Sequence, residues 1–201
     1  MKKSLLSLIA LTSVGLLAFT VVNELPIGSS LPKADVKMKD ISGNEVSLKD
    51  AQRKNGLLVM FSCNTCPYVI KNQSRTLEIS KYASENNVGV IIVNSNEAYR
   101  SGEDSYDAMK EYGRKQGYKW FYVVDKNSEL ADAFGAKKTP ECFLFDDEGK
   151  LVYHGAIDDN PSNATAVGRK HLKEAIDEMT SGKDISVKTS RSVGCTIKRV
   201  E

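Results

Sequence analysis

Apolar and polar positions alternate along this chain with two different periods, and the changes of period mark a succession of strands and helices. The segments 57–62 and 88–93 are almost continuously apolar, as expected for strands that are covered on both faces of a sheet. In 36–39 apolar and charged side chains alternate, which is typical of an edge strand, and its partner is expected at 45–48, after a turn at 42–44.

The rest of the pattern predicts further strands and helices in alternation. Pro67 stands where a helix tolerates proline, in its first turn, and it opens a helix that runs to about residue 86. The remaining expected elements are a helix at 105–116, a strand at 120–124, a short helix from 127 or 128 to 135, a hairpin of 142–145 with 151–153, and a last amphipathic helix at 166–179. This order predicts an α/β fold with a mixed central sheet flanked by helices.

The N-terminus has the pattern of an export signal. Lys2 and Lys3 precede an apolar stretch at 5–22, and no acidic residue occurs before Glu24. The stretch predicts either a signal peptide or an uncleaved membrane anchor, since its length nearly spans a hydrocarbon core of about 30 Å. We therefore expect a signal or anchor at 1–22, a linker at 23–33, a folded domain at 34–201, and a periplasmic or other extracytoplasmic location. Attachment to the inner membrane would run through residues 5–22.

Composition limits the function classes. The chain has 201 residues, enough for one domain with a sizeable core, and its net charge is only +2. The charges are interspersed, so no basic surface for nucleic acid is expected. Lysines and arginines become denser after Lys183, which we interpret as a solvated tail.

Candidate chemistry begins at two of the four cysteines. Cys63 and Cys66 follow the apolar strand 57–62 and open the long helix. The unpaired N–H groups and partial positive charge of a helix N-terminus favour a thiolate, which is the nucleophile of disulfide exchange, and a second cysteine one turn later can resolve the mixed disulfide. A zinc site or an inert disulfide are the alternatives. Zinc needs four ligands, and the other candidates show no paired spacing: Cys142, Cys195, His154 and His171.

Several motifs of the chain resemble a known superfamily. The strand followed by Cys63-Asn64-Thr65-Cys66-Pro67, together with Thr139-Pro140 before a later strand, resembles the thioredoxin-like superfamily. A closer resemblance is to a bacterial branch grouped with the redoxin, or alkyl hydroperoxide reductase/thiol-specific antioxidant, proteins, and it covers roughly residues 30 to 200. The motifs that carry it are 63–69, Glu103-Asp104-Ser105, Thr139-Pro140-Glu141, 153–159 and 194–198.

The resemblance implies a thioredoxin-like fold and roles for particular residues. Cys63 would be the nucleophile and Cys66 the resolving cysteine. Pro140 would follow a cis peptide bond beside the dithiol, and Thr139 would contact the backbone of the substrate. The resemblance thus implies a peptide geometry that the structure can test, because cis X-Pro bonds are uncommon, about one in twenty.

The chain departs from the patterns of two relatives. Thioredoxins have tryptophan before the first cysteine and a buried acid six residues before it, where this chain has Ser62 and Leu57. Peroxiredoxins place threonine or serine three residues before the peroxide-reactive cysteine and proline four residues earlier still. Counted back from Cys63 these positions are Met60 and Gly56, so the pattern favours disulfide exchange over peroxide reduction.

Cys142 and Cys195 are candidate auxiliary redox cysteines. We hypothesise that they pair with each other, or that one of them exchanges with Cys63 and Cys66. The alternative for Cys142 is a buried apolar role, which is common for free cysteine. His154 could serve with the dithiol as a copper ligand, as in thioredoxin-fold copper chaperones, and its alternative is a surface position on the hairpin.

The sequence therefore predicts an exported thiol-disulfide oxidoreductase that needs no cofactor. Its partners would be a protein or small-molecule disulfide and an external thiol donor. A thiol peroxidase is the alternative enzyme, and a copper chaperone is the non-enzymatic alternative.

Overall fold

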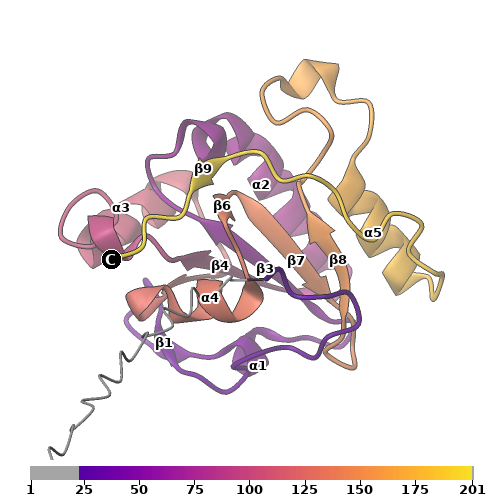
Figure 1. Ribbon diagram of the computed structural model, residues 1–201, viewed down its shortest axis with the longest axis horizontal. Helices are drawn as coiled ribbons and strands as arrows, with labels where there is room; N and C mark the ends of the chain where they lie inside the picture. The colour runs from indigo at the N-terminus through magenta and orange to yellow at the C-terminus, as the bar shows by residue number, and fades with distance from the viewer. Residues whose placement is uncertain (1–22, 201) are drawn as a thin grey trace, which may run out of the picture.

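The centre of the molecule is a mixed sheet with helices on both faces (Figure 1). The computed structural model describes residues 23–200. Within them the sheet has the strand order β5-β4-β3-β7-β8, in which β3, β4 and β5 are parallel and β7 and β8 are antiparallel to their neighbours. The bounds are β3 Leu57–Ser62, β4 Gly89–Asn94, β5 Phe121–Val124, β7 Glu141–Phe145 and β8 Leu151–Gly155. The predicted α/β architecture is confirmed.

The longer and the shorter helices cover opposite faces of the sheet. The long ones pack on one face: α2 Pro67–Glu85, α3 Tyr106–Gln116 and α5 His171–Thr180. The other face carries α1 Leu48–Ala51, α4 Glu129–Phe134 and the hairpin of β1 Met38–Lys39 with β2 Glu45–Val46. Short 3₁₀ turns occur at Glu97–Tyr99, Lys126–Ser128 and Ala164–Ala166.

The apolar run of β3 is explained by the two cores that it serves. Leu57, Val59 and Phe61 face the core beneath α1 and α4, whereas Leu58 and Met60 face the core beneath α2 and α5. Alternate side chains of a strand point to opposite faces, so a strand covered on both sides needs an apolar residue at every position. β3 is therefore a fully buried central strand, and Cys63 directly follows its last residue.

An aromatic cluster joins α4 to the sheet. The ring of Phe134 lies edge-on to those of Phe61, Phe143 and Phe145, with centroids 5.3, 5.1 and 5.7 Å apart. All four side chains are fully buried. Edge-to-face pairs of this kind add to the free energy gained by burying the rings, so α4 is held firmly on β3 and β7.

The last helix begins later than its sequence pattern predicts. The expected start was residue 166, but α5 begins at His171. The preceding loop is held against α2 by the buried guanidinium of Arg75, whose Nη1 donates to both carboxylate oxygens of Asp158 at 2.8 and 2.7 Å and to the carbonyl of Asn160 at 2.7 Å. The residues just before α5 are tied to this loop and not to a helical turn, since the N–H of Asp159 donates to the carbonyl of Arg169 at 3.1 Å and the N–H of Gly168 donates to the carboxylate of Asp159 at 3.0 Å.

The segment 23–33, expected as a linker, lies along the domain. Its backbone N–H groups at Leu25, Gly28 and Leu31 donate to carbonyls of the domain at 2.8–3.1 Å. The expected signal or anchor at 1–22 lies outside the described residues. Among residues 23–200, none of the helices has the length and apolar character needed to cross a bilayer.

The C-terminal tail is not the solvated segment that its lysines suggested. Residues 183–200 run across the end of the sheet, as the yellow segment of Figure 1 shows, and Ile185 and Ile197 are buried. Two residues of the tail form β9 (Cys195–Thr196), which pairs antiparallel with β6 (Lys138–Thr139). A strand of two residues is too short to produce a recognisable alternation of apolar and polar positions, so the sequence did not predict it.

Replacing Phe134 with alanine tests the aromatic cluster. Phe134→Ala should lower the free energy of unfolding by about 3–5 kcal/mol, because it removes a fully buried ring and leaves a cavity. Val36→Ala is the control, since that side chain is 46% exposed and its loss should change stability by less than about 0.5 kcal/mol. Urea unfolding followed by circular dichroism measures both, and equal effects would contradict the packing described here.

Candidate active site

Strand register brings the cysteine motif and the Thr139-Pro140 motif together. β3 and β7 are antiparallel with Phe61 opposite Glu141, so the residues after β3 and those before β7 lie at the same end of the sheet. Cys63 follows β3, and Pro140 directly precedes β7. The peptide bond between Thr139 and Pro140 is cis, which confirms that prediction.

Thr139 contacts three of the cysteines. Its hydroxyl oxygen lies 3.5 Å from Sγ of Cys63. Its carbonyl oxygen lies 3.3 Å from Sγ of Cys66 and accepts a hydrogen bond from that atom when Cys66 is a free thiol. Its backbone is paired in the β6–β9 ladder with that of Cys195. The residue before the cis proline therefore holds the cysteine cluster together.

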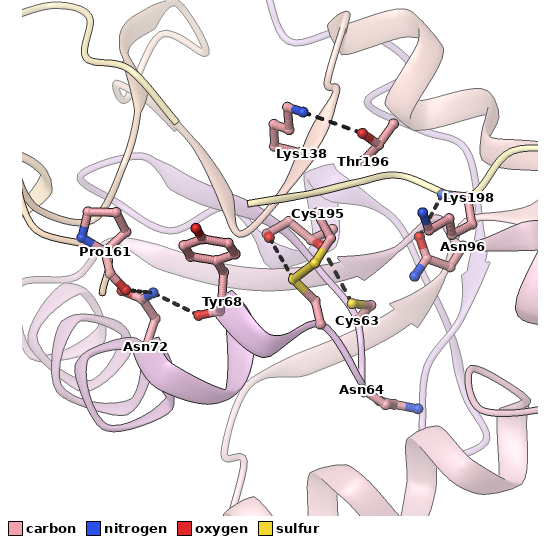
Figure 2. Close-up of a disulfide and its surroundings, with 12 residues drawn as sticks. Cys63, Asn64, Tyr68, Asn72, Asn96, Lys138, Pro161, Cys195, Thr196 and Lys198 are labelled. Carbon is pink, nitrogen blue, oxygen red and sulfur yellow. Dashed lines mark hydrogen bonds between the residues drawn. A yellow bond between two sulfur atoms is a disulfide. The ribbon is translucent and has the colours of Figure 1, made fainter. Parts of the chain in front are cut away.

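A disulfide joins Cys66 to Cys195, across 129 residues of sequence and with the Cα atoms 6.0 Å apart. Cys63 is a free thiol beside it, as Figure 2 shows. The expected pairing of Cys142 with Cys195 is wrong. Cys142 is a free, fully buried residue of β7 whose side chain packs in the core beneath α2 and α5, so the apolar alternative describes it.

The surroundings of Cys63 oppose ionisation in this form. Burial is the largest effect and raises the pKa of the Cys63 thiol above its ordinary value, and the nearby carboxylate of Asp104 raises it further. The Thr139 hydroxyl and the backbone N–H groups of Thr65 and Cys66 act in the opposite direction and lower that pKa. The expected stabilisation of a thiolate at the start of α2 is thus present but is outweighed by desolvation.

A buried polar network fixes the turn between the two cysteines. Asp104 accepts hydrogen bonds from the backbone N–H of Asn64 at 2.9 Å and from the side chains of Asn94 and Asn96 at 2.7 and 2.8 Å. The side-chain oxygen of Asn64 accepts from the hydroxyl of Tyr122 at 2.8 Å. Buried polar groups need such partners, and here their pairing sets the conformation of the turn after Cys63.

The same network reaches the tail. The side-chain oxygen of Asn96 accepts from the backbone N–H of Lys198 at 2.9 Å, and the carbonyl of Lys198 accepts from Ala98 at 2.9 Å. Asp104, bonded to Asn64 on one side and to Asn96 on the other, links the cysteine turn to the tail.

His154 lies inside the molecule rather than on the hairpin surface. Its Nε2 is 2.8 Å from the carboxylate of Glu141, and the ring stacks on Phe143. The other carboxylate oxygen of Glu141 accepts from the backbone of Lys137 and Lys138 at 2.7 and 2.9 Å. This pair therefore supports the segment before the cis proline. Residues 23–200 contain no cluster of three or more potential metal-ligating side chains, so the copper ligands Cys63, Cys66 and His154 are not brought together.

The loop between β8 and α5 contacts the N-terminal part of α2. The side chain of Asn72 donates to the carbonyls of Tyr68 and Pro161 at 2.7 and 3.0 Å, and Tyr68 packs against the cysteine cluster (Figure 2). The site is thus enclosed by α2, by the cis-proline turn and by the tail.

Comparison with known proteins places this fold and this motif in a family. The family model described as Redoxin matches residues 26–168. The chain belongs to the Redoxin family. The tail that carries Cys195 lies beyond the matched residues.

Individual relatives agree with the family assignment. The thiol-disulfide oxidoreductase ResA of Halalkalibacterium halodurans is 24% identical over 152 residues, covering 73% of this chain and 81% of the relative. The crystal structure of an uncharacterized conserved protein from Geobacillus kaustophilus is 32% identical with a TM-score of 0.82, covering 89% of this chain and 94% of the other. The 89% coverage shows that this structural match spans most of the chain.

More distant structures show the shared fold alone. The thioredoxin domain of the thiol-disulfide oxidoreductase BVU-2223 from Bacteroides vulgatus is 22% identical with a TM-score of 0.54, covering 65% of this chain and 89% of that one. PrxQ from Xylella fastidiosa is 17% identical with a TM-score of 0.57, covering 80% and 98%. The predicted thioredoxin-like fold is confirmed, and its presence in both proteins leaves the chemistry to be argued from the site.

Sequence reasoning assigned no role to Asp104 or Glu141. Both lie within motifs of the family resemblance, at 103–105 and 139–141, so the signal was present. Their partners, Asn96 and His154 among them, come from other strands and loops, and a contact of that range is not visible in the local pattern.

Removing the charge of Asp104 should change the ionisation of Cys63. Because the carboxylate raises the pKa of the Cys63 thiol, Asp104→Asn should lower that pKa and move the alkylation of Cys63 to lower pH. The pH profile of iodoacetamide labelling, read by peptide mass spectrometry, measures this. Asp107→Asn, at an exposed carboxylate of α3, is the control and should leave the profile unchanged. Coincident profiles of wild type and Asp104→Asn would show that Asp104 does not act on Cys63.

Proposed function

We propose that this Redoxin-family chain is an exported thiol-disulfide oxidoreductase in which Cys63 is the nucleophile and Cys66 the resolving cysteine. The observation that carries the proposal is the position of Thr139. Its hydroxyl faces Cys63 and its carbonyl faces Cys66, directly before the cis proline. A cysteine pair held at the start of a helix, beside a short strand that already pairs with β9, suits exchange with an extended disulfide-containing chain that takes the place of β9.

The reaction begins with both cysteines reduced. The Cys63 thiolate attacks one sulfur of a substrate disulfide, a new bond forms to Cys63, and the other substrate sulfur leaves as a thiolate. Cys66, as a thiolate, then attacks Sγ of Cys63, which breaks the mixed disulfide and releases the second substrate thiol. Two electrons pass from the dithiol to the substrate, and an external thiol donor restores the reduced enzyme.

Two roles belong to residues around the cysteines. The Thr139 hydroxyl lowers the pKa of the Cys63 thiol and so favours the attacking thiolate. The bonds of Asp104 and Tyr122 to Asn64 hold the turn between Cys63 and Cys66 in one conformation. A fixed geometry of this kind reduces the entropic cost of the second attack.

Peroxide reduction is the alternative enzyme activity, and the surroundings of Cys63 favour it less. The position three residues earlier is Met60, whose side chain is buried in the core beneath α2 and α5. It therefore offers no hydroxyl to a peroxide at that position. The experiment below therefore compares hydrogen peroxide with insulin as the oxidant of Cys63.

Export completes the proposal. It rests on the Lys2-Lys3 pair and the apolar stretch at 5–22, which have the pattern of a signal or anchor. A disulfide such as Cys66–Cys195 persists in oxidising compartments, which supports the same location. We further propose that the substrate is a protein or small-molecule disulfide and that the electron donor is an external thiol.

Single-cysteine variants test the roles. Cys63→Ser should lower the rate of insulin disulfide reduction, with dithiothreitol as donor, by about a hundredfold or more, because the attacking sulfur is gone. The double variant Cys66→Ser with Cys195→Ser should accumulate a mixed disulfide on Cys63, visible on a non-reducing gel. Cys142→Ala is the matched control and should retain turnover, since that cysteine lies in the core.

Two results would contradict the proposal. Turnover that survives in Cys63→Ser would exclude Cys63 as nucleophile. Rapid oxidation of Cys63 by hydrogen peroxide, with no reaction toward insulin, would make the peroxidase alternative the function.

A further inference from the structure

The C-terminal tail is built into the site rather than laid over it. Its backbone pairs with β8 on one side, where His154 donates to the carbonyl of Lys188 and Ser190 donates to the carbonyl of His154, both at 3.0 Å. Further along, β9 pairs with β6, with Cys195 opposite Thr139. The tail thus adds a strand at the edge that lies directly before the cis proline.

Two glycines make room for this close approach. A Cβ on Gly194 would lie 2.1 Å from the carbonyl oxygen of Thr139, and a Cβ on Gly155 would lie 2.3 Å from Oγ of Ser190. A contact below 3.0 Å with backbone cannot be relieved by turning a side chain. Glycine at 194 is therefore required for the tail to lie against Thr139.

The three cysteine residues of the cluster differ in their exposure. Cys63 and Cys66 are 1% and 4% exposed, whereas Cys195 is only partly buried. All three pack in one cluster with Val69 and Tyr68, and the free thiol of Cys63 lies beside the bonded pair (Figure 2). A buried thiol next to a disulfide that has one more exposed end is arranged for exchange toward that end.

We propose that Cys195 is a third redox-active cysteine, which exchanges places with Cys63 at the sulfur of Cys66. The Cys63 thiolate attacks Sγ of Cys66, the Cys63–Cys66 bond forms, and the Cys66–Cys195 bond breaks. Cys195 leaves with the electron pair and takes up the proton that Cys63 has lost. One disulfide and one thiol are present before and after, so the step needs no oxidant or reductant.

The direction of attack follows from solvation. A thiolate leaves more readily from a sulfur that water can reach, and Cys195 is the more exposed end of the disulfide. Exchange also removes the disulfide that ties the tail to the start of α2, because that bond joins Cys195 of β9 to Cys66. With the tail held at β6 only by backbone pairing, the edge at Thr139 becomes more accessible to the external thiol donor that reduces the Cys63–Cys66 disulfide. This inference rests on the proposed function and adds to it a tail that is released when Cys63 and Cys66 become paired.

Trapping with iodoacetamide tests the exchange in the full-length oxidised protein. At pH 8.5 the reagent should collect on Cys195 while a Cys63–Cys66 disulfide accumulates, because alkylation of the released thiol makes the exchange irreversible. Peptide mass spectrometry after acid quenching reads both products. Label confined to Cys63, or no label on either cysteine, with Cys66–Cys195 intact would overturn the proposal.

Gly194→Ala provides a variant that keeps every cysteine. Its methyl group would push the tail from Thr139, so labelling of Cys195 should become about tenfold faster as the open population rises. Gly102→Ala is the matched control: the nearest atom to its Cβ would be 3.9 Å away, and its rate should equal that of wild type. An unchanged rate in Gly194→Ala would show that tail docking does not govern the exchange.

Insulin reduction by the same proteins separates this inference from the proposed function. If Cys63→Ser loses turnover but wild-type Cys195 is never labelled, the oxidoreductase stands and the third redox cysteine does not. If Cys63→Ser retains turnover, the proposed function fails, and with it the basis of the inference.

Discussion

The architecture of the site depends on the backbone at Thr139. This residue is the last of β6 and directly precedes the cis proline, and its hydroxyl, carbonyl and strand edge face Cys63, Cys66 and Cys195 in turn. The residues before Thr139 are held in turn by Glu141, which accepts hydrogen bonds from the backbone N–H groups of Lys137 and Lys138. Glu141 is also paired with His154 on the neighbouring strand.

Desolvation and hydrogen bonding act against each other at Cys63. The Cys63 residue is buried, and burial raises the pKa of its thiol more than the Thr139 hydroxyl and two backbone N–H groups lower it. In the disulfide-bonded form the Cys63 thiol is therefore less readily ionised than a solvated cysteine thiol. Cys195 of the tail packs against the cluster of Cys63 and Cys66, so displacement of the tail would reduce the desolvation that opposes ionisation of Cys63.

The sequence predicted the framework well, and the reason is local. The strand 57–62 and the helix after Pro67 are strong periodic patterns, and β3 and α2 match them closely. The cis bond before Pro140 came from the resemblance of the motif. These features are encoded by residues that lie next to one another in the chain.

The parts that sequence did not predict depend on contacts between distant residues. The disulfide Cys66–Cys195 spans 129 residues, and spacing alone did not distinguish it from other pairings. The tail appeared solvated because its lysines and arginines dominate its composition, whereas its docking depends on Gly194, two buried isoleucines and backbone pairing. His154 lies on a hairpin that the sequence pattern predicts to be exposed, and only the folded structure shows that this residue is buried.

The central claim is that the tail is part of the site, and disulfide mapping of the air-oxidised full-length chain tests it most directly. Free thiols are blocked in acid, the protein is digested without reduction, and cross-linked peptides are identified by mass spectrometry. The account predicts a cross-linked peptide pair that contains Cys66 and Cys195, with Cys142 recovered as a blocked thiol. Recovery of Cys195 as a blocked thiol in every molecule would contradict it.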